Sequence, residues 1–196
     1  MKDIPELDRR PILVAVAGPN GAGKTTFYYA HIAPVALRYV SADILARELE
    51  MDAYAAAKAA DAIRRALLGR KESFAFETVF SDPAGDKLNF LKEAVAAGYT
   101  VVLCFIGLEG AGLSEERVAM RVSQGGHDVP TKKLKSRFPR TLRNLKAAIG
   151  ALPLVYVFDN SDLSRPFRKV GVFKNGRPVE KLKAAPDWFT RVLPTV

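Results

Sequence analysis

Short apolar runs alternate with longer segments of helical periodicity along most of this chain. The runs have the length of strands and are rich in aliphatic, β-branched and aromatic residues; they occupy 11–17, 37–40, 74–76, 100–106, 154–158 and 168–173. Between them, apolar residues recur three and four positions apart over 25–32, 55–68, 86–97, a segment beginning at Ser114, and 131–149. Parallel strands connected by helices are covered on both faces. We therefore expect an α/β fold with a doubly wound, mainly parallel sheet and helices on both of its faces.

Two of the expected helices contain residues that complicate the pattern. In the alanine-rich segment 55–68, the spacing places Ala59, Ile63 and Leu67 on one face and leaves Arg64 outside it. In 131–149, Pro139 interrupts the apolar stripe, so we expect a kink or a restart of the helix there.

A glycine-rich segment joins the first expected strand to the first helix and matches G-x-x-x-x-G-K-[ST] at every fixed position. Backbone N–H groups in such a loop, together with the positive end of the helix dipole, cradle the phosphates of a nucleoside triphosphate. Lys24 would reach the β- and γ-phosphates, and the Thr25 hydroxyl would bind Mg²⁺. The residues predicted to bind ATP are Gly18, Pro19, Asn20, Gly21, Ala22, Gly23, Lys24, Thr25 and Thr26.

The alternative interpretation of this segment is a glycine-rich turn that matches by chance, which the strand before it and the helix after it disfavour. The Asn-Lys-x-Asp element with which GTPases read guanine is absent, so ATP is the expected nucleotide.

The length of 196 residues suits one domain, 1–196, with a sizeable core. The net charge of +9 favours anionic ligands, but its excess lies largely in 132–146 without interleaved aromatic residues. We therefore expect small phosphorylated ligands rather than a nucleic acid. No apolar run is long enough to span a membrane, the first ten residues lack the apolar region of a signal peptide, and Cys104 is the single cysteine. These features predict a cytoplasmic protein.

Two carboxylates follow expected strands, at the edge where parallel sheets bind ligands. Asp43 would face the phosphates and accept the proton of a hydroxyl awaiting phosphorylation, although the segment 41–43 could also serve only to cap the next helix. Glu77 would hold Mg²⁺ through water or accept a hydrogen bond from the acceptor; its alternative is a partly exposed strand-end glutamate. Thr78 and Ser81 would line the same pocket as substrate-binding hydroxyls.

Basic residues gather in the segment 114–140, which we expect to form a helical lid. Arg117 and Arg121 share one helix face, and Lys133, Arg137 and Arg140 share one side of the next helix, with the hinge-like 124–130 between the two groups. Phosphoryl transfer builds negative charge that arginines on a closing lid stabilise, and such a lid also excludes water. The alternative is a solvated basic face.

Several of these segments together resemble the zeta toxin family of small bacterial kinases. They are 18–26, 41–43, 76–78, the run from Arg121 through Gly126-His127 to Arg140, and 156–161. The resemblance implies a kinase that phosphorylates the 3′-hydroxyl of UDP-N-acetylglucosamine with ATP and Mg²⁺, and it allows an antitoxin protein as a partner.

Residue by residue, the same resemblance implies that Asp43 is the base and that Glu77 and Thr78 bind the sugar nucleotide. It implies that Arg121 and Arg137 contact the transferred phosphate. Arg117 and Arg140 are their neighbours, and we expect them to bind the substrate. The segment 77–81 lacks the glycine and arginine of the family's substrate segment, which leaves the acceptor less defined than the chemistry.

Three hypotheses follow. The first is an ATP- and Mg²⁺-dependent kinase of a hydroxyl on a small nucleotide-linked molecule. The second is a kinase of another acceptor, either a nucleoside or a polynucleotide end. The third is a regulatory module that binds ATP without phosphorylating an acceptor. Asp43 distinguishes the kinases from the module, because only a kinase needs a base at the end of the second strand.

Overall fold

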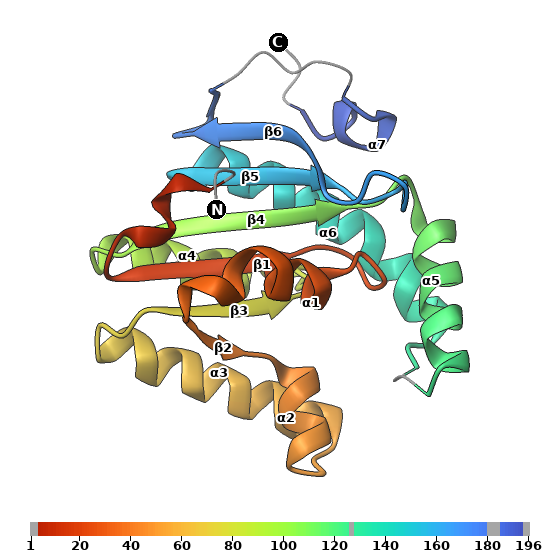
Figure 1. Ribbon diagram of the computed structural model, residues 1–196, viewed down its shortest axis with the longest axis horizontal. Coiled ribbons are helices and arrows are strands. Elements are labelled where there is room, and N and C mark those ends of the chain that lie inside the picture. Colours follow the sequence, from red (N-terminus) through yellow and green to blue (C-terminus); the bar gives the residue numbers. More distant parts are fainter. Residues whose placement is uncertain (1–3, 126–127, 180–184, 194–196) are drawn as a thin grey trace.

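Seven strands form one sheet in the computed structural model, which describes residues 4–125, 128–179 and 185–193 (Figure 1). Their order across the sheet is β2-β3-β1-β4-β5-β6-β7. The first five strands are parallel to their neighbours, and the last two are antiparallel. The bounds are β1 Ile12–Ala17, β2 Arg38–Val40, β3 Phe74–Thr78, β4 Thr100–Gly107, β5 Leu154–Asp159, β6 Arg168–Lys174 and β7 Arg177–Pro178.

Helices cover both faces of this sheet, as the alternating pattern predicts (Figure 1). The α-helices are α1 Lys24–Phe27, α2 Ala42–Glu48, α3 Ala53–Gly69, α4 Asp86–Ala96, α5 Ala111–Ser123, α6 Thr131–Ala151 and α7 Asp187–Thr190. A π-helix, Tyr28–Ile32, continues α1, and 3-10 turns occupy Pro5–Asp8 and Ala33–Val35. The strand order places β1 at the centre of the parallel part, so the loop that follows β1 lies between the ends of β3 and β4.

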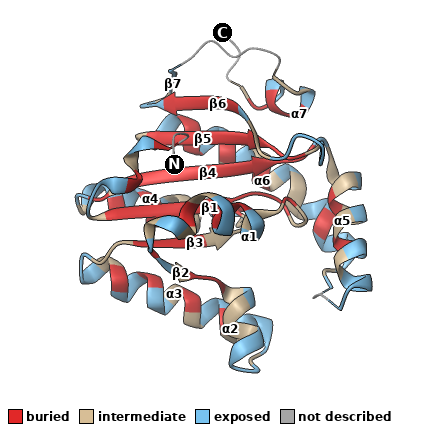
Figure 2. Ribbon diagram, viewed as in Figure 1, coloured by how far each residue is buried: buried red, intermediate tan, exposed pale blue. Residues whose placement is uncertain are grey.

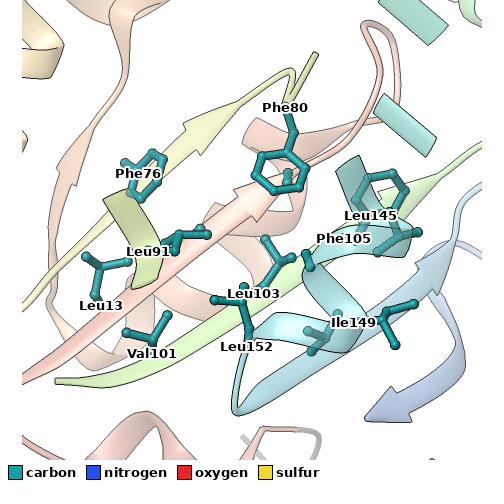
Figure 3. Packing of buried hydrophobic residues seen from close by; sticks show 14 of the residues in the cluster. Leu13, Phe76, Phe80, Leu91, Val101, Leu103, Phe105, Leu145, Ile149 and Leu152 are labelled. Atoms are coloured by element: carbon teal, nitrogen blue, oxygen red, sulfur yellow. The ribbon is translucent and has the colours of Figure 1, made fainter. Parts of the chain in front are cut away.

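Apart from Thr100 at the start of β4, every residue of β1, β4 and β5 is buried, because helices shield both faces of these strands (Figure 2). One core cluster packs α3, α4, α6 and α7 against one face; Leu103, Phe105 and Leu145 are among its members (Figure 3). The other cluster packs α1 and the π-helix against the opposite face through Phe27 and Ile32. Burial on two faces explains why these strands are continuous apolar runs.

The structure corrects the pattern predicted for one helix and decides part of the expectation for another. The buried face of α3 contains Ala56, Ala60, Arg64 and Leu67. Of the predicted face, Leu67 is confirmed as buried, but Ile63 is 38% exposed, so the orientation predicted for this helix was wrong. Alanines lie on several sides of this helix, so the spacing of its apolar residues does not clearly indicate which side is buried. In α6, the helix runs through the exposed Pro139 without a restart. Within the described ranges, no helix combines the length and the apolar character needed to cross a bilayer.

Candidate functional site

The loop between β1 and α1, residues 18–26 (here the phosphate loop), depends on glycine at three positions. Gly18, Gly21 and Gly23 have φ angles of 148°, 74° and 83°. A Cβ atom at Gly18 would lie 2.2 Å from the Ile106 carbonyl oxygen, so no other residue fits there without movement of β4. The loop therefore packs tightly against the sheet, and its backbone conformation depends on glycine.

Contacts from outside the phosphate loop hold its backbone in place, and the sequence pattern did not predict them. The buried Asn160, which follows β5, donates from Nδ2 to the Ala22 carbonyl oxygen at 3.0 Å. The Ser114 hydroxyl donates to the Asn20 carbonyl oxygen at 2.7 Å. The helix therefore does not begin at Ser114, as the sequence pattern predicted: α5 begins at Ala111, and the Ser114 side chain turns to the loop.

A pocket with a cavity volume of about 560 Å³ opens beside the phosphate loop. Residues of the loop border it, as do residues of α2, α3 and β3, Lys87 of α4, and residues of α5 and α6. Of the sequence-predicted site residues, those that border the pocket are Asn20, Gly21, Gly23, Lys24, Thr25, Thr26, Asp43, Glu77, Thr78, Arg117, Arg121 and Arg137. Gly18, Pro19 and Ala22 of the phosphate loop do not border it. Charged groups that are far apart in the sequence therefore meet at the edge of the sheet where its parallel strands end.

Lys24 lies among the charged groups of this pocket. Its Nζ donates to the carbonyl oxygens of Gly18 and Pro19 at 3.1 and 3.0 Å. Burial of the ammonium group lowers the pKa of Lys24; the carboxylates of Glu77 and Asp43 act in the opposite direction. Arg121 and Arg137 lower this pKa further. A polyphosphate entering the pocket would thus meet a group of cations and replace the carbonyl oxygens as the partner of Lys24.

Glu77 at the end of β3 is fixed by two hydroxyl groups. Thr25 Oγ1 donates to Glu77 Oε2 at 3.0 Å, and Ser41 Oγ donates to Oε1 at 2.5 Å. Tyr39 stacks on Tyr28 with ring centroids 3.6 Å apart, and burial, followed by the Glu77 carboxylate, strongly raises the pKa of the Tyr39 hydroxyl. Glu77 is therefore a positioned carboxylate beside the phosphate loop.

The oxygen atoms of Thr25 and Glu77 fit a Mg²⁺ ion. Mg²⁺ prefers oxygen ligands and retains several waters and phosphate oxygens, so it needs few protein ligands. In the described part of the chain, no group of three or more His, Cys, Asp or Glu side chains converges as a ready-made metal cage. The pair of a hydroxyl and a carboxylate is the kind of site that binds Mg²⁺ together with a nucleotide.

Asp43 is exposed in the first turn of α2 and borders the pocket. The cap of this helix is Ser41, whose hydroxyl oxygen accepts a hydrogen bond from the Ile44 N–H at 3.3 Å. The capping role that we had left open for 41–43 thus falls to Ser41, and the Asp43 side chain lies at the pocket. Its role as a base stays a prediction.

The predicted lid arginines divide into two sets. Arg117, Arg121 and Arg137 border the pocket; Arg117 also donates from Nη2 to the Ser161 carbonyl oxygen at 3.1 Å. Arg140 and Ser81 do not border the pocket: they bind each other, through Arg140 Nε and the Ser81 carbonyl oxygen at 3.0 Å. Substrate contacts of Arg140 and Ser81 remain sequence predictions. Gly126 and His127 of the expected hinge lie outside the described residues.

The hydrogen bond from Arg140 is one of several by which side chains of α6 hold the loop that follows β3. Thr141 Oγ1 donates to the Val79 carbonyl oxygen at 3.0 Å, and Asn144 Nδ2 donates to the carbonyl oxygens of Phe80 and Asp82, both at 3.0 Å. Val79 borders the pocket. Residues of α6 thus position part of the pocket wall, in addition to the arginine that α6 places there.

A scan against protein-family models finds no match for this chain, and a search of curated proteins finds none. Solved structures do match. The complex AvrRxo1-ORF1:AvrRxo1-ORF2 with sulphate ions gives a TM-score of 0.74 at 16% identity, and the same complex with ATP gives 0.73 at 17%. Each match covers 98% of this chain and 66% of that chain, so this chain spans just under two thirds of the AvrRxo1 chain's length.

A second match is the PezAT chromosomal toxin-antitoxin system of Streptococcus pneumoniae. Its TM-score is 0.59 at 15% identity, and the match covers 98% of this chain and 82% of that chain. Identities this low establish the fold alone. The chain has the α/β fold of phosphate-loop kinases, and the fold supports the resemblance to the zeta toxins.

Proposed function

We propose that this protein transfers the γ-phosphate of ATP to a hydroxyl group of a small nucleotide-linked acceptor. The observation that carries the proposal is that Asp43 and Lys24 border one pocket, where the charge of the carboxylate opposes the lowering of the Lys24 pKa by burial. A site that only binds ATP needs no base opposite the phosphate loop. A kinase needs one to receive the proton of its acceptor.

The proposed reaction assigns each charged group a task. The acceptor oxygen forms a bond to the γ-phosphorus, the bond from that phosphorus to the β–γ bridging oxygen breaks, and ADP leaves with the electron pair. Asp43 takes the proton of the acceptor hydroxyl. Lys24, Arg121 and Arg137 stabilise the charge on the phosphate oxygens. Thr25 and Glu77 would hold Mg²⁺, which neutralises charge on the phosphates when it is bound.

The anchoring of α5 supports this assignment. The first part of α5 is tied to the phosphate loop through Ser114 and to the end of β5 through Arg117, so its arginines project from a fixed base. Electrostatic stabilisation is most effective when the donors are positioned before the reaction. The likeness to a structure solved with ATP supports ATP as the donor.

The acceptor that we propose is UDP-N-acetylglucosamine, on the strength of the resemblance to the zeta toxins. PezAT is a toxin-antitoxin system, which supports a protein partner of the antitoxin class for this chain. The reactants are cytoplasmic metabolites, so we place the protein in the cytoplasm.

Incubation with ATP and Mg²⁺ and a panel of sugar nucleotides, nucleosides and 5′-hydroxyl oligonucleotides, read by mass spectrometry, tests the proposal. We expect a gain of one phosphoryl group on UDP-N-acetylglucosamine and none when Lys24→Ala replaces the wild type. Phosphorylation of a nucleoside or an oligonucleotide instead would show a different acceptor. ATP binding without transfer to any alcohol would indicate the regulatory module and refute the kinase.

A further inference from the structure

Arg64 is a buried cation that borders the same pocket. It is 4% exposed, although the sequence pattern placed it outside the buried face of α3. Its Nη2 donates to Asp61 Oδ1 at 2.8 Å, and its guanidinium carbon lies 5.0 Å from the centre of the Phe76 ring. Among the described residues, its Nε atom has no hydrogen-bond partner. A buried guanidinium with an unused donor is costly unless something else contacts the group.

The face of α3 that Arg64 shares is open to the pocket. Ala53 and Ala57 of α3 also border the pocket. Ala57 lies four residues after Ala53, and Arg64 lies seven residues after Ala57, so all three side chains lie along one side of the helix. Because alanine side chains are small, a molecule in the pocket can lie along α3 as far as the guanidinium group. Lys87 of α4 borders the pocket as well and adds a second cation.

The charges of this cluster do not cancel. Lys87 Nζ lies 3.2 Å from the same Asp61 Oδ1 that Arg64 contacts. Burial opposes the ionisation of Asp61, but Arg64 and Lys87 outweigh burial and lower its pKa. Arg64 and Lys87 therefore share Asp61 as their ion-pair partner. Both cations border the pocket, whereas Asp61 and the neighbouring Asp82 do not, so the pocket wall is positive at this point. An ion pair between a buried guanidinium and a carboxylate that is 39% exposed contributes little net stability, so stability alone gives no reason for arginine at this position.

We propose that Arg64, assisted by Lys87, binds a phosphate or diphosphate group of the acceptor. The inference rests on the proposed function, and it goes further by assigning the selection of an anionic acceptor to residues of α3 and α4. A neutral sugar or a nucleoside would bring no negative charge to this positive part of the pocket wall and would be a poor substrate. UDP-N-acetylglucosamine and nucleoside monophosphates belong to the class that the cluster accepts.

Two matched pairs of acceptors test this selection: UDP-N-acetylglucosamine against N-acetylglucosamine, and UMP against uridine. Binding is measured by calorimetry on the protein saturated with a non-hydrolysable ATP analogue and Mg²⁺, so that the phosphate loop is occupied. We expect the anionic member of each pair to bind at least tenfold more tightly. Arg64→Gln should weaken that binding about tenfold or more while the affinity for ATP stays within twofold of the wild type.

Arg65→Gln is the matched control. Arg65 is the next residue of α3 and contacts the same Asp61, with its Nε 3.3 Å from Oδ2, but it does not border the pocket. This variant should bind both pairs as the wild type does. Lys87→Gln should weaken binding of the anionic members severalfold, and it decides the matter if the buried Arg64 variant fails to fold.

Three results would overturn the inference. The two members of each pair could bind equally well, neither anionic member could bind, or the Arg64 and Arg65 variants could bind the anionic members with the same affinity. Transfer assays on the same pairs separate it from the proposed function. Transfer that is equally efficient to neutral and anionic members leaves the kinase intact and refutes the role of Arg64. Arg64-dependent binding without transfer to any alcohol supports the anion site and refutes the kinase.

Discussion

Removal of the Asn160 amide should loosen the phosphate loop and weaken ATP binding. Asn160 Nδ2 donates to the Ala22 carbonyl oxygen at 3.0 Å, and its Oδ1 accepts from the Phe167 N–H at 3.3 Å. A Cβ atom at Gly23 would lie 2.9 Å from the same Nδ2, so the amide packs directly on the loop. Asn160→Ala removes both hydrogen bonds and leaves the Ala22 carbonyl oxygen and the Phe167 N–H without these partners. We expect each loss to cost about 1.5 kcal/mol of stability, and the two together about 3 kcal/mol.

For a domain of this size, 3 kcal/mol lowers Tm by roughly 6–12 °C. Part of the cost falls on ATP binding, because the ligand has to reorder the loosened loop. We expect about a tenfold rise in the Kd for ATP, equivalent to about 1.4 kcal/mol. Differential scanning calorimetry gives the first quantity, and titration calorimetry with ATP and Mg²⁺ gives the second.

Asn144→Ala is the matched control for this experiment. Asn144 also makes two hydrogen bonds, to the Phe80 and Asp82 carbonyl oxygens, but it holds the loop after β3 and not the phosphate loop. We expect a comparable fall in Tm with the Kd for ATP within twofold of the wild type. If both variants weaken ATP binding equally, the effect is general destabilisation, and the specific role of Asn160 is refuted.

Two further predictions concern the cations of the pocket. Arg121→Gln and Arg137→Gln should each lower kcat about 100-fold while the KM for ATP changes only a few-fold. As a control, replacement of the exposed Arg143 by glutamine should change neither kcat nor KM. A larger effect of the pocket variants on KM than on kcat would indicate a solvated basic face. Because burial lowers the pKa of Lys24, the free protein should lose this proton at a lower pH than an ordinary lysine and regain it when ATP binds. Calorimetry in buffers of different ionisation enthalpy should detect proton uptake on ATP binding at pH values below 10.5, the ordinary pKa of lysine, and Lys24→Arg should abolish it. Uptake that persists in Lys24→Arg would contradict the assignment. In the nucleotide-free protein the folded state binds fewer protons than the unfolded state over that range, so this lysine makes the free energy of unfolding rise with pH there.

Local patterns predicted the parts of the site that lie within one segment. The glycine spacing of 18–25 specifies the loop, and the continuous apolar strands specify a parallel sheet. In that sheet β3 pairs with β1, which brings Glu77, expected at the end of its strand, to Thr25. Such inferences succeed because the end of each parallel strand falls on the same edge.

Contacts between distant segments could not be predicted in this way. Asn160 and Ala22 are 138 positions apart, and Ser114 and Asn20 are 94 positions apart, so no local period relates them. Arg64 was missed for a different reason. In an alanine-rich helix the apolar pattern has little contrast, and an arginine is normally assigned to the exposed side.

Single-turnover transfer by Asp43→Asn decides whether the carboxylate at the end of β2 acts on the acceptor. The assay follows phosphate from γ-labelled ATP to UDP-N-acetylglucosamine, and calorimetry measures ATP affinity on the same sample. Because the amide cannot accept the hydroxyl proton, we predict a rate reduced about 10²- to 10⁴-fold with the Kd for ATP within twofold of the wild type. Transfer at the wild-type rate, or a loss of ATP binding as large as the loss of rate, would contradict the assignment of Asp43 as the base.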